Sequence, residues 1–133
     1  METVQQRVEL KDTHEIELPS LDVSKYVGTK VKIDAISENQ GNFGYFVKVE
    51  TQVLDVIQEM KDPESGKPLQ LRASRIFGLQ EDAEGNIGWG KQTKLGVFLA
   101  KMKCKHYKDL LGKEVVVQTI TNKNDGKDYL SFN

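Results

Sequence analysis

Cationic and aromatic side chains alternate with aliphatic ones in three short segments: residues 30–35 (KVKIDA), 45–50 (YFVKVE) and 69–74 (LQLRAS). A period of two residues predicts β-strands, in which neighbouring side chains point to opposite faces. If the aliphatic residues point inward, the outward set is Lys30, Lys32, Phe46, Lys48, Gln70, Arg72 and Ser74. Cations that follow phosphates and a ring that stacks on a base are the two elements of single-stranded nucleic-acid binding. The alternative is a solvated face with one aromatic ring covered by the N-terminal segment.

Further residues extend this candidate site. Phe43 has inward parity, but it lies beside the turn 38–42 and can reach a ligand from the end of the strand. Phe77 lies where the alternation fails. Trp89, between two glycines, either stacks on a base or closes one end of the core. The turn 122–127 offers two lysines and two asparagines. The predicted nucleic-acid-binding residues are therefore Lys32, Phe43, Phe46, Lys48, Arg72, Phe77, Trp89, Lys123 and Lys127.

No combination of residues indicates catalysis, a metal site or a cofactor. One cysteine and two histidines cannot complete a tetrahedral zinc site without carboxylates. Cys104 lies two residues before His106 and among lysines that would lower the pKa of its thiol, which leaves a remote redox hypothesis. The simpler interpretation is a cysteine that packs as a small apolar residue. We therefore expect neither enzyme activity nor a cofactor, and no small-molecule substrate.

Length and composition fit one domain of 133 residues. The formal net charge is −1, but residues 88–133 carry nine basic and four acidic side chains, against ten and sixteen in residues 1–87. This asymmetry suggests that one face prefers anions. The chain has no apolar run long enough for a membrane helix, and its single cysteine fits a reducing compartment. Residues 1–6 have neither a basic patch nor an apolar core, so we do not expect a secretory signal. We expect a cytoplasmic protein that does not associate with membranes.

The elements that would position these residues are strands with one helix among them. Strands are predicted at 30–35, 45–50, 69–74, 114–121 and 128–132, and residues 53–57 could extend the second. A helix should follow the N-cap Thr93, because Leu95, Phe98, Leu99 and Met102 form one apolar stripe. Lys94, Lys101, Lys105 and Lys108 form a second stripe, either solvated or facing phosphates. A helix between the third and fourth strands predicts an all-β fold, the five-stranded Greek-key barrel known as the OB-fold.

Three segments resemble a known family. Residues 26–33 (YVGTKVKI), 110–117 (LLGKEVVV) and 127–132 (KDYLSF) are similar to the first, fourth and last strands of OB-fold single-stranded-DNA-binding domains of the archaeal replication-protein-A type. The resemblance covers roughly residues 26–133, and no site residue is carried over from it. Residues 1–24 would form an acidic N-terminal arm or extra edge strand, and residues 25–133 the OB-fold domain.

Two functions remain open. The first is binding of single-stranded nucleic acid, DNA or RNA with DNA favoured, with little sequence preference. The second is a protein-interaction OB module, a subunit of a replication or repair assembly, in which the acidic residues 2–22 dock a basic partner. Salt-dependent binding of an unstructured oligonucleotide would favour the first, because phosphate contacts release counterions.

The outward parity of Phe46 gives the first testable prediction. Phe46→Ala should weaken binding of a single-stranded oligonucleotide by roughly 1–3 kcal/mol, the contribution of one stacked base. It should change the melting temperature little, because an exposed ring buries little area. The companion variant Lys48→Ala should cost less affinity. It should also lower the slope of log affinity against log salt concentration by about the contribution of one phosphate contact.

The opposite result would come from a buried ring, whose loss costs about 3–5 kcal/mol of folding free energy. If Phe46→Ala lowers the melting temperature sharply and leaves affinity per folded molecule intact, the strand is one residue out of register. The binding face would then have to be rebuilt around Tyr45 and Phe43.

Overall fold

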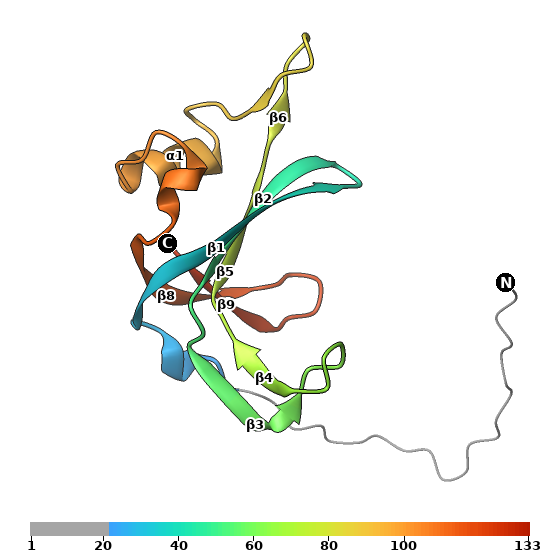
Figure 1. The fold of residues 1–133 in the computed structure, drawn as a ribbon, viewed down its shortest axis with the longest axis vertical. Helices are drawn as coiled ribbons and strands as arrows, with labels where there is room; N and C mark the ends of the chain where they lie inside the picture. Colours follow the sequence, from blue (N-terminus) through green and yellow to red (C-terminus); the bar gives the residue numbers. More distant parts are fainter. Residues whose placement is uncertain (1–21) are drawn as a thin grey trace, which may run out of the picture.

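The computed structural model describes residues 22–133, which form a mostly β fold with one α-helix (Figure 1). Five strands form an antiparallel sheet in the order β5-β2-β1-β8-β9. Their bounds are β1 Lys30–Gly41, β2 Gly44–Thr51, β5 Ser74–Gly78, β8 Glu114–Thr121 and β9 Asp128–Phe132. The sheet curls until its two end strands, β5 and β9, contact each other. No backbone ladder joins these two strands in the described part of the chain, so the sheet is not a closed barrel there.

The first strand belongs to both halves of the sheet. Residues Lys30 to Lys32 pair with β8, and the residues from Ile33 to Gly41 pair with β2. The register shifts between Ile33 and Ala35, which marks an irregularity of the β-bulge type. The predicted first strand, 30–35, is confirmed, but the predicted turn 38–42 is wrong for residues 38–41: β1 continues to Gly41, because its pairing with β2 extends to the Gly41–Gly44 pair. The predicted arm, residues 1–24, lies outside the described residues except for Asp22 to Ser24, where the short 3-10 helix η1 (Ser24–Tyr26) begins.

The third strand of the sheet is not the segment that the sequence predicted. β3 (Asp55–Lys61) and β4 (Pro68–Leu71) pair only with each other, as a separate hairpin. The chain leaves the sheet at Thr51 and returns at Ala73, and two hydrogen bonds of 2.9 and 3.0 Å join these residues. The third strand of the sheet is β5, which pairs with β2. The sequence pattern did not distinguish the two, because a strand in an inserted hairpin has the same two-residue period as a strand in the sheet. The expectations that 53–57 could extend the second strand and that 69–74 forms the third strand of the sheet were therefore wrong.

The helix begins where it was predicted, but it ends before two of the four lysines that were predicted to form a basic stripe on it. Thr93 caps α1 (Lys94–Lys101), its side chain accepting a hydrogen bond from the Gly96 amide. Leu95, Phe98 and Leu99 are buried, as the apolar stripe predicted. The stripe of four lysines is not a helix face, since Lys105 and Lys108 lie beyond the last helical residue. No helix in residues 22–133 is long and apolar enough to cross a membrane.

The core lies inside the curled sheet under this helix. Phe98 packs against Phe77 of β5 and Phe132 of β9, with ring centroids 5.3 and 5.8 Å apart. Other fully buried side chains come from three strands of the sheet, from α1 and from the segment after it: Ile33, Val47, Val49, Val117, Leu95 and Leu110. The helix is therefore joined to the sheet by aromatic packing.

The start of the helix also fixes the preceding loop. Residues 80–88 form a small hairpin of β6 (Gln80–Glu81) and β7 (Ile87–Gly88), which projects from the sheet in Figure 1. Residues 89–93 then return to the helix. A Cβ atom at Gly96 would lie 2.2 Å from the Gly90 carbonyl oxygen and 2.8 Å from that of Lys91. The loop can approach the helix this closely only because residue 96 has no side chain.

This close approach yields a stability prediction. Gly96→Ala should lower the free energy of unfolding by roughly 1–3 kcal/mol, as overpacking typically does, because the atoms in the way are backbone. Urea denaturation followed by circular dichroism would measure the loss. Gly88→Ala is the matched control, since a Cβ there meets no atom within 4 Å and the φ of Gly88 is not positive. Equal stability of the two variants would contradict the argument.

Candidate nucleic-acid interface

The outer face of β2 carries the aromatic and cationic pair that the sequence predicted. Val47 and Val49 are fully buried, whereas Phe46 and Lys48 on the opposite face are half-exposed. The outward parity of β2 is thus confirmed. In the register, Phe46 lies between Asn39 of β1 and Gly78 of β5, and Lys48 lies between Ser37 and the exposed Ile76. We call these outward residues (Ser37, Asn39, Phe46, Lys48 and Ile76) the strand face.

Glycine shapes the end of the strand face. A Cβ at Gly41 would lie 3.2 Å from Cε1 of Phe46, so the ring lies against the Gly41 backbone. This contact explains why Phe46 is only half-exposed. The remaining part of its ring is open to a ligand. The strand face therefore offers an aromatic and an aliphatic side chain beside one ammonium group.

Three predicted residues lie elsewhere. Phe77 is 1 % exposed and packs in the core, so its ring is not available to a ligand. Arg72 precedes β5, and its guanidinium donates to Asp34 at 3.0 Å and to the Thr51 carbonyl at 3.2 Å, which ties down the base of the β3–β4 hairpin. Lys32 is exposed, but it pairs with Glu114 across the β1–β8 ladder. It lies roughly 15 Å along β1 from the residue that faces Lys48. None of the three joins the strand face.

Two hairpin tips carry the other exposed candidates. Phe43 is fully exposed in the turn between β1 and β2. Lys123 and Lys127 are exposed in the turn between β8 and β9. In Figure 1 both turns project toward the same side of the molecule. The second turn is braced by side chains, since Asp125 accepts hydrogen bonds from the Lys127 amide and the Tyr129 hydroxyl. These bonds hold the pKa of Asp125 below its usual value.

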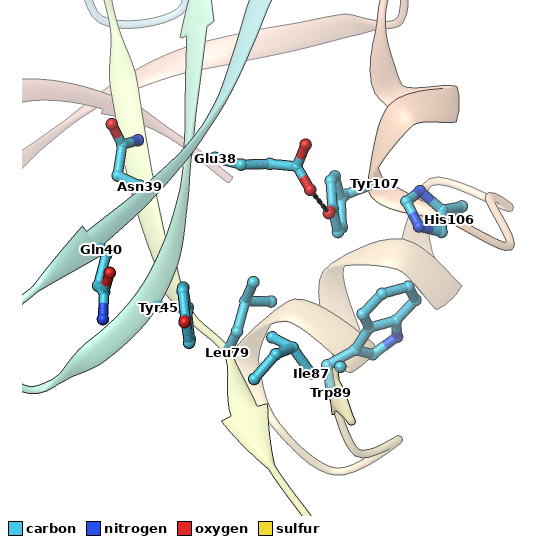
Figure 2. A pocket seen from close by; sticks show the side chains of 10 residues that line it. Glu38, Asn39, Gln40, Tyr45, Leu79, Ile87, Trp89, His106 and Tyr107 are labelled. Carbon is cyan, nitrogen blue, oxygen red and sulfur yellow. Dashed lines mark hydrogen bonds between the residues drawn. The ribbon is translucent and has the colours of Figure 1, made fainter. Parts of the chain in front are cut away.

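A pocket of about 430 Å³ lies where β1 and β2 extend beyond the core (Figure 2). The two strands supply one wall, and the segments that flank the helix supply the other. We call it the Trp89 pocket. Its lining residues are Glu38, Asn39, Gln40, Tyr45, Leu79, Ile87, Gly88, Trp89, His106 and Tyr107.

Three aromatic rings form one wall of the Trp89 pocket. The centroid of Trp89 lies 5.2 Å from that of His106 and 5.5 Å from that of Tyr107, both in edge-on arrangements. His106 and Tyr107 are fixed in turn by a capping box at the start of the 3-10 helix η2 (Tyr107–Leu110): His106 Nδ1 accepts from the Lys108 amide, and Asp109 accepts from the His106 amide. Trp89 is half-exposed, so it both packs against the core and faces the pocket.

A hydrogen bond joins the two walls. The Tyr107 hydroxyl donates to Oε2 of Glu38 on β1, as the dashed line in Figure 2 marks. Burial, together with this bond to a carboxylate, raises the pKa of Tyr107 to about 12. The phenol is therefore a permanent donor at neutral pH and holds the carboxylate in place.

Sequence reasoning did not place Glu38, Tyr45 and Tyr107 in a site. The two-residue period of 45–50 gives Tyr45 the inward parity of Val47, and residues 107–111 carry no pattern typical of a binding site. No local signal could have united them, because Glu38 and Tyr107 are 69 positions apart in the chain. Cys104 is half-buried and its thiol donates to the Met102 carbonyl, which fits a packing role. Residues 22–133 contain no group of three or more side chains suited to holding a metal ion.

Comparison of the chain with protein-family models, with curated proteins and with solved structures found no match.

The bond between Tyr107 and Glu38 gives a pH-dependent prediction. Tyr107→Phe should lower stability at pH 7 by about 1 kcal/mol, or roughly 4 °C in melting temperature. A raised pKa means that the folded state holds the phenol proton more tightly than the unfolded chain, in which tyrosine titrates near pH 10. This stabilisation is complete below pH 10 and is lost as the pH rises toward 12. The difference between wild type and variant in thermal melts should therefore shrink over that range.

Tyr129→Phe serves as the control, because its hydroxyl bonds an aspartate on an exposed turn and should contribute little. A Tyr107→Phe difference that stays constant from pH 8 to pH 12 would show that the bond to Glu38 is not responsible.

Proposed function

We propose that the chain is an OB-fold domain that binds single-stranded nucleic acid, with DNA favoured over RNA. The connectivity supports this: five antiparallel strands in the order β5-β2-β1-β8-β9, a helix between the third and fourth of them, and contact between the two end strands. An OB-fold is a partly open five-stranded barrel with this arrangement. It binds oligonucleotides across its second and third strands, here β2 and β5, and between the loops that join strands one to two and four to five.

The observation that carries the proposal is the Trp89 pocket. Tyr45, Trp89, His106 and Tyr107 surround a volume within the range of small-ligand sites. The pocket lies on the inner face of the β1–β2 extension, opposite the strand face, and the exposed Phe43 lies in the turn at the tip between the two faces. Stacking of one base on an aromatic ring contributes about 1–3 kcal/mol and tolerates any base. A single-stranded nucleic acid that passed around this tip, with bases on Phe46, on Phe43 and in the pocket, would be held mainly by stacking.

Few cations are assigned to the phosphates of the bound nucleic acid. Lys48 lies on the strand face, and Lys123 and Lys127 lie on the β8–β9 turn. Each phosphate contact on a single strand contributes about −0.7 to the slope of log affinity against log salt. Three contacts predict a slope near −2, which is shallow for a nucleic-acid-binding protein. The proposal includes a cytoplasmic location, supported by the single cysteine, and needs no cofactor.

A second candidate function is a protein-interaction module within a replication or repair assembly. The observation that favours it is an apolar area on the outer face of β8 and β9. Ile120 and Tyr129 are cross-strand partners, each 48 % exposed, and Val116 on the same face of β8 is 47 % exposed. Exposed apolar areas of this kind mark partner surfaces. Double substitution of Ile120 and Tyr129 to serine would abolish such an interaction without affecting the strand face.

A salt titration tests the first proposal. A labelled oligonucleotide of fifteen thymidines should bind in fluorescence anisotropy at low salt, and the double variant Lys123→Ala/Lys127→Ala should lower the salt slope by about 1.4, twice the contribution of one contact. The control is Lys94→Ala/Lys101→Ala, the same charge change on the exposed side of α1. It should leave the slope unchanged. Equal effects of the two pairs would show that only net charge matters, and absence of binding at low salt would refute the proposal.

A further inference from the structure

The Trp89 pocket differs from the strand face in its electrostatics. Its ten lining residues include one carboxylate, Glu38, and no lysine or arginine. A phosphate placed there would meet a negative charge without a cation to offset it. The aromatic and aliphatic side chains of the walls suit a flat, apolar ring instead. The charge of the lining therefore excludes the backbone of a nucleic acid and favours a base.

Glu38 is exposed to solvent, accepts one hydrogen bond and retains free acceptor capacity. Tyr107 donates to Oε2, and in residues 22–133 no other group donates to this carboxylate. A carboxylate has about four lone-pair sites, so Oε1 and one site on Oε2 remain for a ligand. Figure 2 shows the side chain extending from β1 toward the aromatic wall. A ring that entered the pocket would therefore meet a pair of acceptors.

Among the bases, only guanine presents two adjacent donors on one edge, the N1–H and the N2 amino group. These can form two parallel charge-assisted hydrogen bonds with a carboxylate. Adenine and cytosine each set an acceptor nitrogen beside their amino group, and that nitrogen would face the carboxylate lone pairs. Thymine has one N–H between two carbonyl oxygens. A carboxylate that loses its water without gaining donors is costly, which penalises these three bases.

We infer that the Trp89 pocket is a guanine-selective base site within a track that otherwise tolerates any sequence. Glu38 reads the donor edge of the base, Trp89 and Tyr45 cover its faces, and Tyr107 is a positioning residue that holds Glu38. The inference rests on the proposed function for its ligand, because the guanine would arrive as part of a single strand. It goes beyond stacking by assigning one position of the strand to one base.

Trp89 is the only tryptophan of the chain, so its fluorescence reports occupancy of the pocket. Wild-type protein is titrated with an oligonucleotide of fifteen thymidines and with the same oligonucleotide carrying one central guanine. The guanine should strengthen binding roughly tenfold, as a good bidentate pair does, and should quench Trp89 more strongly. Replacing the guanine by hypoxanthine, which lacks the N2 amino group, should remove most of this increase in affinity.

Glu38→Gln is the decisive variant. It keeps the shape of the side chain and an oxygen for the Tyr107 hydroxyl, but it replaces one acceptor by a donor. The preference for guanine should disappear, so that the variant binds the two oligonucleotides with equal affinity. Glu59→Gln, an exposed glutamate on β3, is the control for the change of charge and should keep the preference. Melting curves of all three proteins establish that each variant is folded.

The outcomes separate the two claims. If the thymidine strand binds and the guanine adds nothing, or if its advantage survives Glu38→Gln, the guanine site is refuted and the proposed function stands. If the thymidine strand does not bind at low salt, the proposed function fails. Free guanosine and adenosine then decide the pocket: quenching of Trp89 by guanosine alone, lost in Glu38→Gln, supports the site, and equal or absent quenching overturns it.

Discussion

The pairing of β1 with two different neighbours is the constraint on which the rest of this structure depends. Its first residues pair with β8, and after the irregularity between Ile33 and Ala35 it pairs with β2. β1 therefore bends around the core, so that the β8–β9 half and the β2–β5 half of the sheet lie on different sides of it. The side chains on its inner face, Val31 and Ile33, pack with Val47 and Val49, and burial of each such residue contributes about 1.5–3 kcal/mol. Without this change of direction, β5 and β9 would not meet.

The same strand builds the site, because β1 and β2 are longer than the core that they cover. Alternation continues beyond the last buried pair, so Glu38 and Tyr45 share the inner face with Val47 but have no core to fill. The space is closed from the other side by Trp89 and Tyr107. Trp89 depends on the approach of its loop to Gly96, and Tyr107 depends on the capping box of η2. Thus two local devices hold the wall that faces the strands.

Local patterns in the sequence predicted the strands and the helix cap well. Four of the five strands in the sheet, the N-cap Thr93 and the outward parity of Phe46 and Lys48 follow from periods of two or 3.6 residues and from capping chemistry. The inserted hairpin could not be recognised, because a strand in a side hairpin alternates like a strand in the main sheet. Arg72 was expected to be free for the same reason: its partner Asp34 is 38 positions away, and no local pattern shows the pairing. The pocket, drawn from three distant segments, depends on tertiary structure altogether.

The distribution of charge decides which interactions can dominate binding. The net charge is −1 and the proposal assigns three cations to phosphates, so counterion release would supply only part of the proposed affinity. Aromatic contacts would have to supply the remainder, and these depend on geometry that salt does not screen. A domain of this kind would hold a single-stranded nucleic acid loosely along the strand face and more firmly where the ring of a base is enclosed in the Trp89 pocket. In the proposed site, enclosure would bring the base edge against Glu38, and a desolvated polar edge discriminates between bases in a way that an open stacking platform does not. Under this proposal, weak overall electrostatics and one selective position would be two consequences of the same arrangement of side chains.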